Sequence, residues 1–108
     1  MEKKIRNVEH RKLQSIGCNY NYALKRMKEL TRSRIYSESE REIKNQYRNY
    51  IDVVTRCYVK CNPLERIFLE KEYFAPSPKG WWYNIYSRST YYRLRLATAR
   101  KFLAFFAQ

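Results

Sequence analysis

Apolar residues recur every three or four positions through most of the chain, the spacing of helices that bury one face. The first such stretch runs from Leu13 to Leu30. Gly17 lies within it, and because glycine is a weak helix former, we expect the helix to be weak or broken there. A second stripe, from Ile43 to Cys61, extends for about six turns and predicts the longest helix and the spine of the core.

Helix-start signals divide this pattern into segments. Ser37 and Glu40 form the S-x-x-E pattern of a capping box, in which the hydroxyl and the carboxylate each satisfy a backbone amide at a helix start. Asn62 followed by Pro63 ends that helix and begins a short third one, since asparagine is a good N-cap and proline suits the first helical position. We therefore expect three helices before the loop that follows.

The strongest break in the pattern is at residues 75–80, which contain two of the three prolines and one of the two glycines and predict a loop. Residues 81–86 are an aromatic run expected to form a short helix-like segment. Ser87 can cap a last helix from about Arg88 to about Phe106. The side chains expected to face the core from this helix are Tyr91, Leu94, Thr98, Phe102 and Phe105.

Charge adds a partner class to this picture. Lysine and arginine number 23 against 10 aspartates and glutamates, a formal net charge of +13. This excess is larger than solubility requires and indicates a polyanionic partner. No acidic residue follows Glu72, whereas the same segment contains Lys79, Arg88, Arg93, Arg95, Arg100 and Lys101. The C-terminal third is therefore the best candidate for the contact.

Catalytic and metal chemistry have little support in the sequence. The chain has one histidine, His10, and three cysteines without the spacing of a zinc site. Cys57 and Cys61 lie four positions apart and are expected to pack as small apolar residues on one helix face. No G-x-S-x-G, H-E-x-x-H or phosphate-binding glycine loop occurs, so we expect no enzyme, no metal and no cofactor. The glutamates at 38, 40, 42, 65, 70 and 72 are expected at helix starts and exposed faces.

The chain lacks an apolar stretch long enough for a membrane span and an apolar signal-peptide core after Met1. We therefore expect a cytoplasmic protein with no membrane contact.

A short helix, a tight turn at Ser87 and a longer basic helix form the plan of a helix-turn-helix. In that motif the first turns of the second helix meet base edges in the major groove, and the preceding turn lies over phosphates. The candidate base-contacting residues are Arg88, Ser89, Tyr92 and Arg93. The candidate phosphate-contacting residues are Lys79, Ser87, Thr90 and Arg95. The alternative is that these residues form the solvated face of a structural helix.

The stretches LER at 64–66, YSRSTYYRL at 86–94 and ARKFL at 99–103 together resemble region 4 of bacterial sigma factors. The resemblance is closer to the ArpU and RinA type of phage late-gene regulator, whose recognition helix commonly reads S-R-x-T-[FY]-Y-R. The chain is also similar to an uncharacterised family of small mollicute proteins with a W-W…Y-S-R-S-T-Y-Y-R tail. The resemblance covers about residues 62–108 and implies that the base-contacting candidates read the major groove. The chain departs from the pattern at residues 84–86, where many helix-turn-helices carry glycine.

These observations predict an all-α fold, a small bundle of about five helices with a C-terminal helix-turn-helix that resembles sigma region 4. Residues 1–61 form the N-terminal helical segment, which completes the core and could contact a second copy or RNA polymerase, and residues 62–108 form the helix-turn-helix region. The length of 108 residues suits one packed domain.

The expected function is a small transcriptional regulator that binds double-stranded DNA, with a homodimer as one possible form because helix-turn-helix proteins often pair. Two alternatives remain at this point. The chain could bind RNA or the ribosome by stacking unpaired bases on aromatic rings, which exposed Trp81 and Trp82 would favour and their burial would disfavour. It could also dock on RNA polymerase, as region 4 of sigma factors does, without reading DNA sequence.

Overall fold

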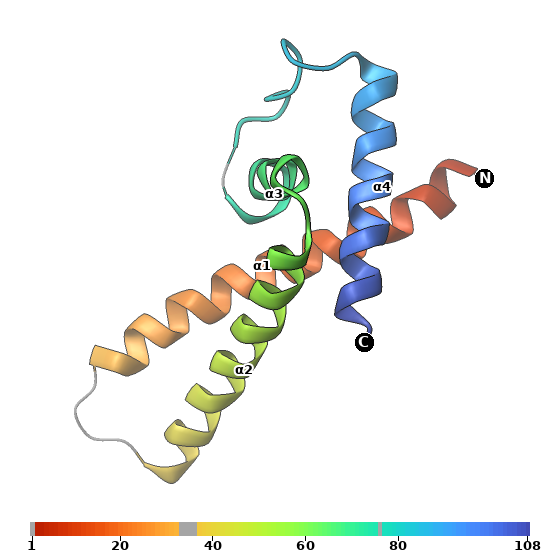
Figure 1. Cartoon of the computed structure of the whole chain (residues 1–108). Coiled ribbons are helices and arrows are strands. Elements are labelled where there is room, and N and C mark those ends of the chain that lie inside the picture. The colour runs from red at the N-terminus through yellow and green to blue at the C-terminus, as the bar shows by residue number, and fades with distance from the viewer. Residues whose placement is uncertain (1, 33–36, 76) are drawn as a thin grey trace.

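A computed structural model of the chain describes residues 2–32, 37–75 and 77–108 (Figure 1). These residues form α1 (Glu2–Arg32), α2 (Glu38–Lys60), α3 (Pro63–Leu69), the π-helical segment η1 (Glu70–Phe74) and α4 (Arg88–Phe106). The all-α prediction is confirmed. The expected count of about five α-helices is not, since the described residues form four. The longest helix is α1 with 31 residues rather than α2 with 23, so that prediction is wrong.

The shape of the molecule is elongated because α1 and α2 extend together away from the rest of the chain (Figure 1). The principal extents are 52 × 28 × 27 Å. Along this pair Leu30 is buried, and the rings of Tyr22 and Tyr47 meet edge to face with centroids 6.0 Å apart. The α1–α2 pair is therefore an arm that carries its own apolar contacts.

The core lies where α4 crosses α1, next to α3, η1 and the end of α2 (Figure 1). Leu13 of α1, Leu69 of α3 and Phe102 of α4 are completely buried there. Cys57 and Cys61 are buried in the same cluster, as their spacing predicts. Burial raises the pKa of both thiols.

Gly17 does not interrupt α1, so the predicted break is wrong. The glycine is instead needed for a close contact between two backbones. A Cβ atom at this position would lie 2.3 Å from the carbonyl oxygen of Tyr73 in η1. The absence of a side chain thus allows α1 to pack directly against the π-helical segment.

Local caps define three of the helix starts, as the sequence predicts. The Ser37 hydroxyl accepts a hydrogen bond from the Glu40 amide at 3.1 Å. Asn62 and Glu65 form a complete capping box, in which each side chain accepts from the other residue's amide, at 2.9 and 2.8 Å. The Ser87 hydroxyl likewise accepts a hydrogen bond from the Thr90 amide at the start of α4, without a reciprocal bond. Each cap needs only residues three positions apart, which is why the sequence signal is reliable.

The helix-like segment expected at residues 81–86 is a series of turns and not a regular helix. Residues 79–85 make consecutive turns, with hydrogen bonds from the Tyr83 amide to the Gly80 carbonyl and from the Ile85 amide to the Trp82 carbonyl. Gly80 has φ +82°, a conformation that suits glycine. The structure thus bears out a loop before α4, although Pro76 lies outside the described residues.

The helical segment that precedes α4 is therefore α3 with η1, and a long connection replaces the three- or four-residue turn of a helix-turn-helix. Figure 1 shows α3 end-on while α4 lies along the plane of the picture, so the two helices run across each other. The expected helix-turn-helix is not confirmed by this arrangement.

Candidate nucleic-acid interface

The candidate interface begins at the N-cap of α4. The Ser87 hydroxyl accepts a hydrogen bond from the Thr90 amide at 3.3 Å and donates one to the Thr90 hydroxyl at 2.8 Å. The first turn of α4 contains no acidic residue. These bonds fix Arg88 as the first helical residue, and they use the hydroxyl proton of Ser87, which the sequence suggested for phosphate contact.

The first turns of α4 present the four candidate base-contacting side chains to solvent. Arg88, Ser89, Tyr92 and Arg93 are all exposed, and Tyr92 retains 41% of its accessible area. On the opposite face Tyr91 is buried against the core. The division of this helix into an outer and an inner face agrees with the helical periodicity of its sequence.

Two guanidinium groups lie over the exposed ring of Tyr92, and one of them also lies over the buried Tyr91 ring. The Arg95 Cζ atom is 4.7 Å from the centre of the Tyr92 ring and 5.7 Å from that of Tyr91. The Arg88 Cζ atom is 5.9 Å from the centre of the Tyr92 ring. Cation–π contacts of this kind restrain long side chains and thereby lower the entropy lost on binding. Arg95 is half-buried by these contacts, so it is less available to a phosphate than the sequence suggests.

The connection before α4 lies beside these residues. The rings of Trp82 and Tyr92 are 6.4 Å apart, and Tyr83 in the same turns keeps 69% of its accessible area. Lys79, the remaining candidate for phosphate contact, is exposed in the first of these turns. The connection thus adds an exposed cation and an exposed ring near the start of α4.

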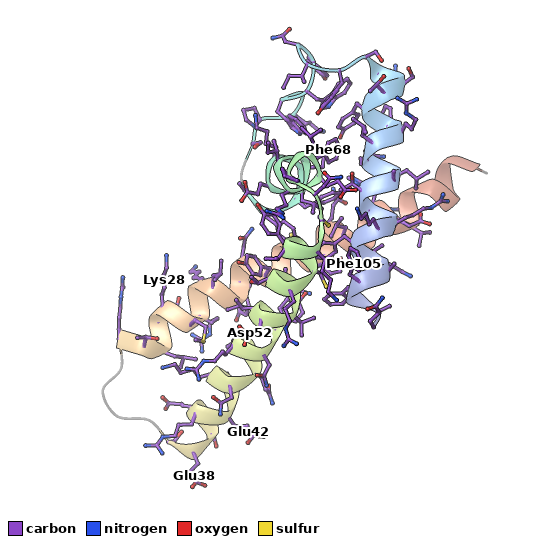
Figure 2. The ribbon with its side chains drawn as sticks, viewed as in Figure 1. Lys28, Glu38, Glu42, Asp52, Phe68 and Phe105 are labelled. Atoms are coloured by element: carbon purple, nitrogen blue, oxygen red, sulfur yellow. The ribbon has the colours of Figure 1, made fainter. Side chains whose placement is uncertain are left out.

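Aromatic packing holds this connection against the core. Trp82 stacks on Tyr91 with ring centroids 4.0 Å apart and planes within 8° of parallel. Trp81 meets Phe68 edge to face at 5.4 Å, and Figure 2 shows Phe68 between α3 and α4. Both tryptophans are half-buried, so their rings are largely engaged within the protein.

The prediction that Glu72 lies on an exposed face is wrong. The side chain of Glu72 is half-buried. Its carboxylate accepts hydrogen bonds from the Tyr91 hydroxyl at 2.8 Å and from Trp81 Nε1 at 3.2 Å. Burial and the bond to Glu72 raise the pKa of Tyr91. Glu72 thereby ties η1 to both the connection and α4. The one sequence signal is that it is the last acidic residue before the acid-free segment.

His10 links α1 to the same region. Its Nδ1 atom is 2.8 Å from the Tyr73 hydroxyl, in a part of the protein that is half-buried. Burial lowers the pKa of His10, and the charge of Arg95 lowers it further, while Glu72 opposes the shift. The histidine is thus a structural contact between α1 and η1.

The described ion pairs leave the first half of α4 unneutralised. Arg100 Nε is 3.5 Å from Glu9 Oε1, and Lys101 Nζ is 2.8 Å from Glu65 Oε1, both in the second half of the helix. Arg88 and Arg93 form no ion pair with a described residue. A polyanion could therefore approach this end of α4 without displacing an internal carboxylate.

Two further observations concern the described residues as a whole. They contain no group of three or more histidine, cysteine, aspartate or glutamate side chains that could hold a metal ion. None of the described helices is both long and apolar enough to cross a membrane.

Comparison with protein-family models, with curated proteins and with solved structures finds no match to this chain. A functional assignment therefore rests on the chemistry and the geometry of its own residues.

Proposed function

We propose that this chain is a small DNA-binding protein, acting as a transcriptional regulator, that reads duplex DNA with the outer face of the first half of α4. The observation that carries the proposal is the pair of exposed arginines, Arg88 and Arg93, without a described acidic partner on a helix fixed to the core. Tyr91 supplies that fixation through Trp82 and Glu72.

The spacing of the exposed residues suits the major groove, which is wide enough for one α-helix. Arg88 and Arg93 are separated along the helix axis by about 7.5 Å, close to two base-pair steps. Each guanidinium group can donate two hydrogen bonds to one guanine. Ser89 can bond a base edge or a phosphate, and the Tyr92 hydroxyl can reach a phosphate oxygen. The four side chains could thus read a short stretch of sequence.

Lys79 is the main candidate for contact with the DNA backbone, and the overall positive charge of the chain attracts that backbone. Ser87 donates its hydroxyl proton to Thr90, and Arg95 lies over two tyrosine rings, so Ser87 and Arg95 are already engaged within the protein. The net charge of +13 attracts any polyanion and favours binding without sequence preference. Specific binding would then depend on α4.

The packing of the tryptophans disfavours the alternative of RNA binding by base stacking. Trp81 lies edge to face on Phe68, and Trp82 covers Tyr91. A base that stacked on the same ring faces would have to displace these contacts. No feature of the described surface favours docking on RNA polymerase over contact with DNA.

The test is selection of duplexes from genomic fragments by the full chain at physiological salt, followed by affinity measurements on the selected and random duplexes. We expect Arg88→Ala and Arg93→Ala each to lose about 1–3 kcal/mol of discrimination at the base pair that they contact. Lys79→Ala should weaken all duplexes alike and reduce the salt slope by about one unit.

Arg48→Ala is the matched control, since Arg48 is an exposed arginine on α2, away from the proposed interface. It should leave sequence preference unchanged. If no duplex binds better than random DNA, the proposal of a sequence-reading regulator is wrong.

A further inference from the structure

A pocket of about 180 Å³ lies between α1, α2 and η1, apart from the outer face of α4. Its lining residues are Tyr20, Val54, Thr55, Tyr58, Glu70 and Phe74. None of these residues belongs to α4, and none was singled out by the DNA-binding proposal. The pocket is therefore a separate feature of the fold.

Three aromatic rings form the walls of this pocket. The Tyr20 and Phe74 rings have centroids 5.5 Å apart and planes inclined at 73°. The Tyr58 and Phe74 rings are 6.4 Å apart with planes inclined at 87°. Both pairs are edge-to-face contacts, and the three rings together line the pocket. All three are half-buried, so the pocket remains open to solvent.

The pocket lining also contains one carboxylate, at the edge of the aromatic box formed by the rings of Tyr20, Tyr58 and Phe74. Glu70 is exposed and lines the pocket together with Tyr58, whose pKa is raised first by burial and then by Glu70. Aromatic faces carry negative electrostatic potential, and the carboxylate adds a full negative charge beside them. The lining thus favours a cation, although the protein as a whole is strongly basic. The charge of Arg66 also acts on Tyr58, but Arg66 does not line the pocket, so Glu70 is the charged residue of the lining. Charges farther away than about 8 Å are largely screened at physiological ionic strength.

The π-helical segment builds this arrangement. Glu70 and Phe74 are its first and last residues, and the Ala75 amide donates to the Glu70 carbonyl at 2.6 Å, which closes the wide turn. Gly17 lets α1 lie directly against this segment and so places Tyr20 one turn further along the same helix. Short π-helical segments are rare and occur often at functional sites.

The described cation–π contacts of the protein do not involve the rings of Tyr20, Tyr58 and Phe74. Among the described side chains, the cation–π contacts involve Phe105, Trp81, Tyr91 and Tyr92, whose partners are lysines and arginines of the chain. The pocket is also smaller than the roughly 300–1,000 Å³ typical of sites that enclose a whole ligand. It therefore suits a compact head group.

We propose that the aromatic box formed by Tyr20, Tyr58 and Phe74, with Glu70 at its edge, binds a methylated ammonium group. Aromatic boxes recognise such groups because the charge is spread over methyl groups that contact the ring faces. The group could belong to a free molecule such as choline or to a trimethylated lysine of a protein. The chemistry recognised is the same in both cases.

The test uses the full chain and nuclear magnetic resonance titration at constant ionic strength. Tetramethylammonium and choline should give saturable shifts at the pocket residues at millimolar concentration. The neutral analogue of choline, with carbon in place of the quaternary nitrogen, should bind roughly three- to tenfold more weakly. Equal affinity for the neutral analogue, or no saturable shift with either cation, would overturn the proposal.

Two variants separate the local charge from the general charge of the protein. Glu70→Gln should weaken choline binding roughly threefold or more, because it removes the carboxylate at the edge of the box. Glu42→Gln causes the same change in net charge, but Glu42 lies near the start of α2 (Figure 2), about 18 Å along that helix from Val54. It should leave the affinity unchanged. Equal losses in both variants would count against the box as the binding site.

The source of the group is distinguished by comparing choline with a short peptide that contains trimethyllysine, and with the same peptide unmethylated. Tighter binding of the methylated peptide than of choline assigns the site to a protein partner, and tighter binding of choline assigns it to a free molecule. Both results support the proposal. Equal binding of the methylated and unmethylated peptides would contradict it.

Discussion

Replacement of Gly17 by alanine should destabilise the protein, although alanine is the better helix former by about 1 kcal/mol. The new Cβ atom would lie 2.3 Å from the Tyr73 carbonyl oxygen and 3.1 Å from its carbonyl carbon. Ordinary contact begins at 3.4 Å, so η1 would have to move by about 1 Å. The obstructing atoms belong to the backbone and cannot rotate away as a side chain could.

The magnitude follows from what this movement disturbs. Tyr73 is 8% exposed and Leu69, just before η1, is completely buried, so a shift of η1 loosens the centre of the core. Overpacking of a dense core costs typically about 1–3 kcal/mol, and contact with backbone indicates the upper part of this range. After the gain in helix propensity, we expect a net loss of about 2 kcal/mol. For a domain of this size the midpoint of thermal unfolding should fall by roughly 8 °C or more.

Urea and thermal unfolding, followed by far-ultraviolet circular dichroism, measure this effect. The matched control is Ser15→Ala, since Ser15 is an exposed residue on the same helix. It should stabilise the protein by roughly 0.5 kcal/mol through helix propensity alone. If Gly17→Ala is as stable as wild type or more stable, the close contact between α1 and η1 is not present as described.

Two further predictions concern the contacts around η1. Tyr91→Phe removes a hydrogen bond to the half-buried Glu72 carboxylate and leaves Trp81 as the described donor to that carboxylate. The free energy of unfolding, measured in urea, should therefore fall by about 1.5–3 kcal/mol. An unchanged midpoint would contradict this role of Tyr91. The pKa of His10 is lowered in the folded protein, so the unfolded chain takes up its proton first as the pH falls below 6.5. The stability advantage of wild type over His10→Gln should therefore be largest above pH 6.5 and shrink below it, as urea unfolding over a pH series would show, and a gap that stays constant would refute the linkage.

Sequence reasoning succeeded where the determining interactions are local. The starts of α2, α3 and α4 follow from Ser37, Asn62 and Ser87, whose partners lie three residues away. The outer and inner faces of α4 likewise follow from its own periodicity, which separates Arg93 from Tyr91. Such signals need no knowledge of the rest of the fold.

The failures involve contacts between distant parts of the chain. Gly17 suggested a broken helix because glycine is a weak helix former. Its actual role, the close contact with Tyr73, cannot be read from the residues around it. Glu72 and its partner Tyr91 are 19 positions apart, and nothing in the intervening sequence identifies the pair. The aromatic run at 81–86 has the composition of a packed helix, but a series of turns packs Trp81, Trp82 and Tyr86 partly against the core and leaves Tyr83 exposed.

The candidate site could likewise be predicted only where it depends on local spacing. Exposure of Arg88 and Arg93 could be predicted from helical spacing. The half-burial of Arg95 could not, since it depends on how its side chain lies over two tyrosine rings. The aromatic pocket was also missed, because its lining comes from three elements, one of which is a π-helical segment that no sequence pattern indicated.

The most direct test of the DNA-binding account compares two double variants with equal loss of charge. One is Arg88→Ala with Arg93→Ala on α4, and the other is Arg41→Ala with Arg48→Ala, both exposed on α2. Affinity for the selected duplex at physiological salt should fall by roughly a hundredfold or more in the α4 variant, since two base contacts are lost. The α2 variant should lose less than about tenfold, the effect of general charge. Equal losses in the two variants would show that net charge alone binds DNA and would contradict the account.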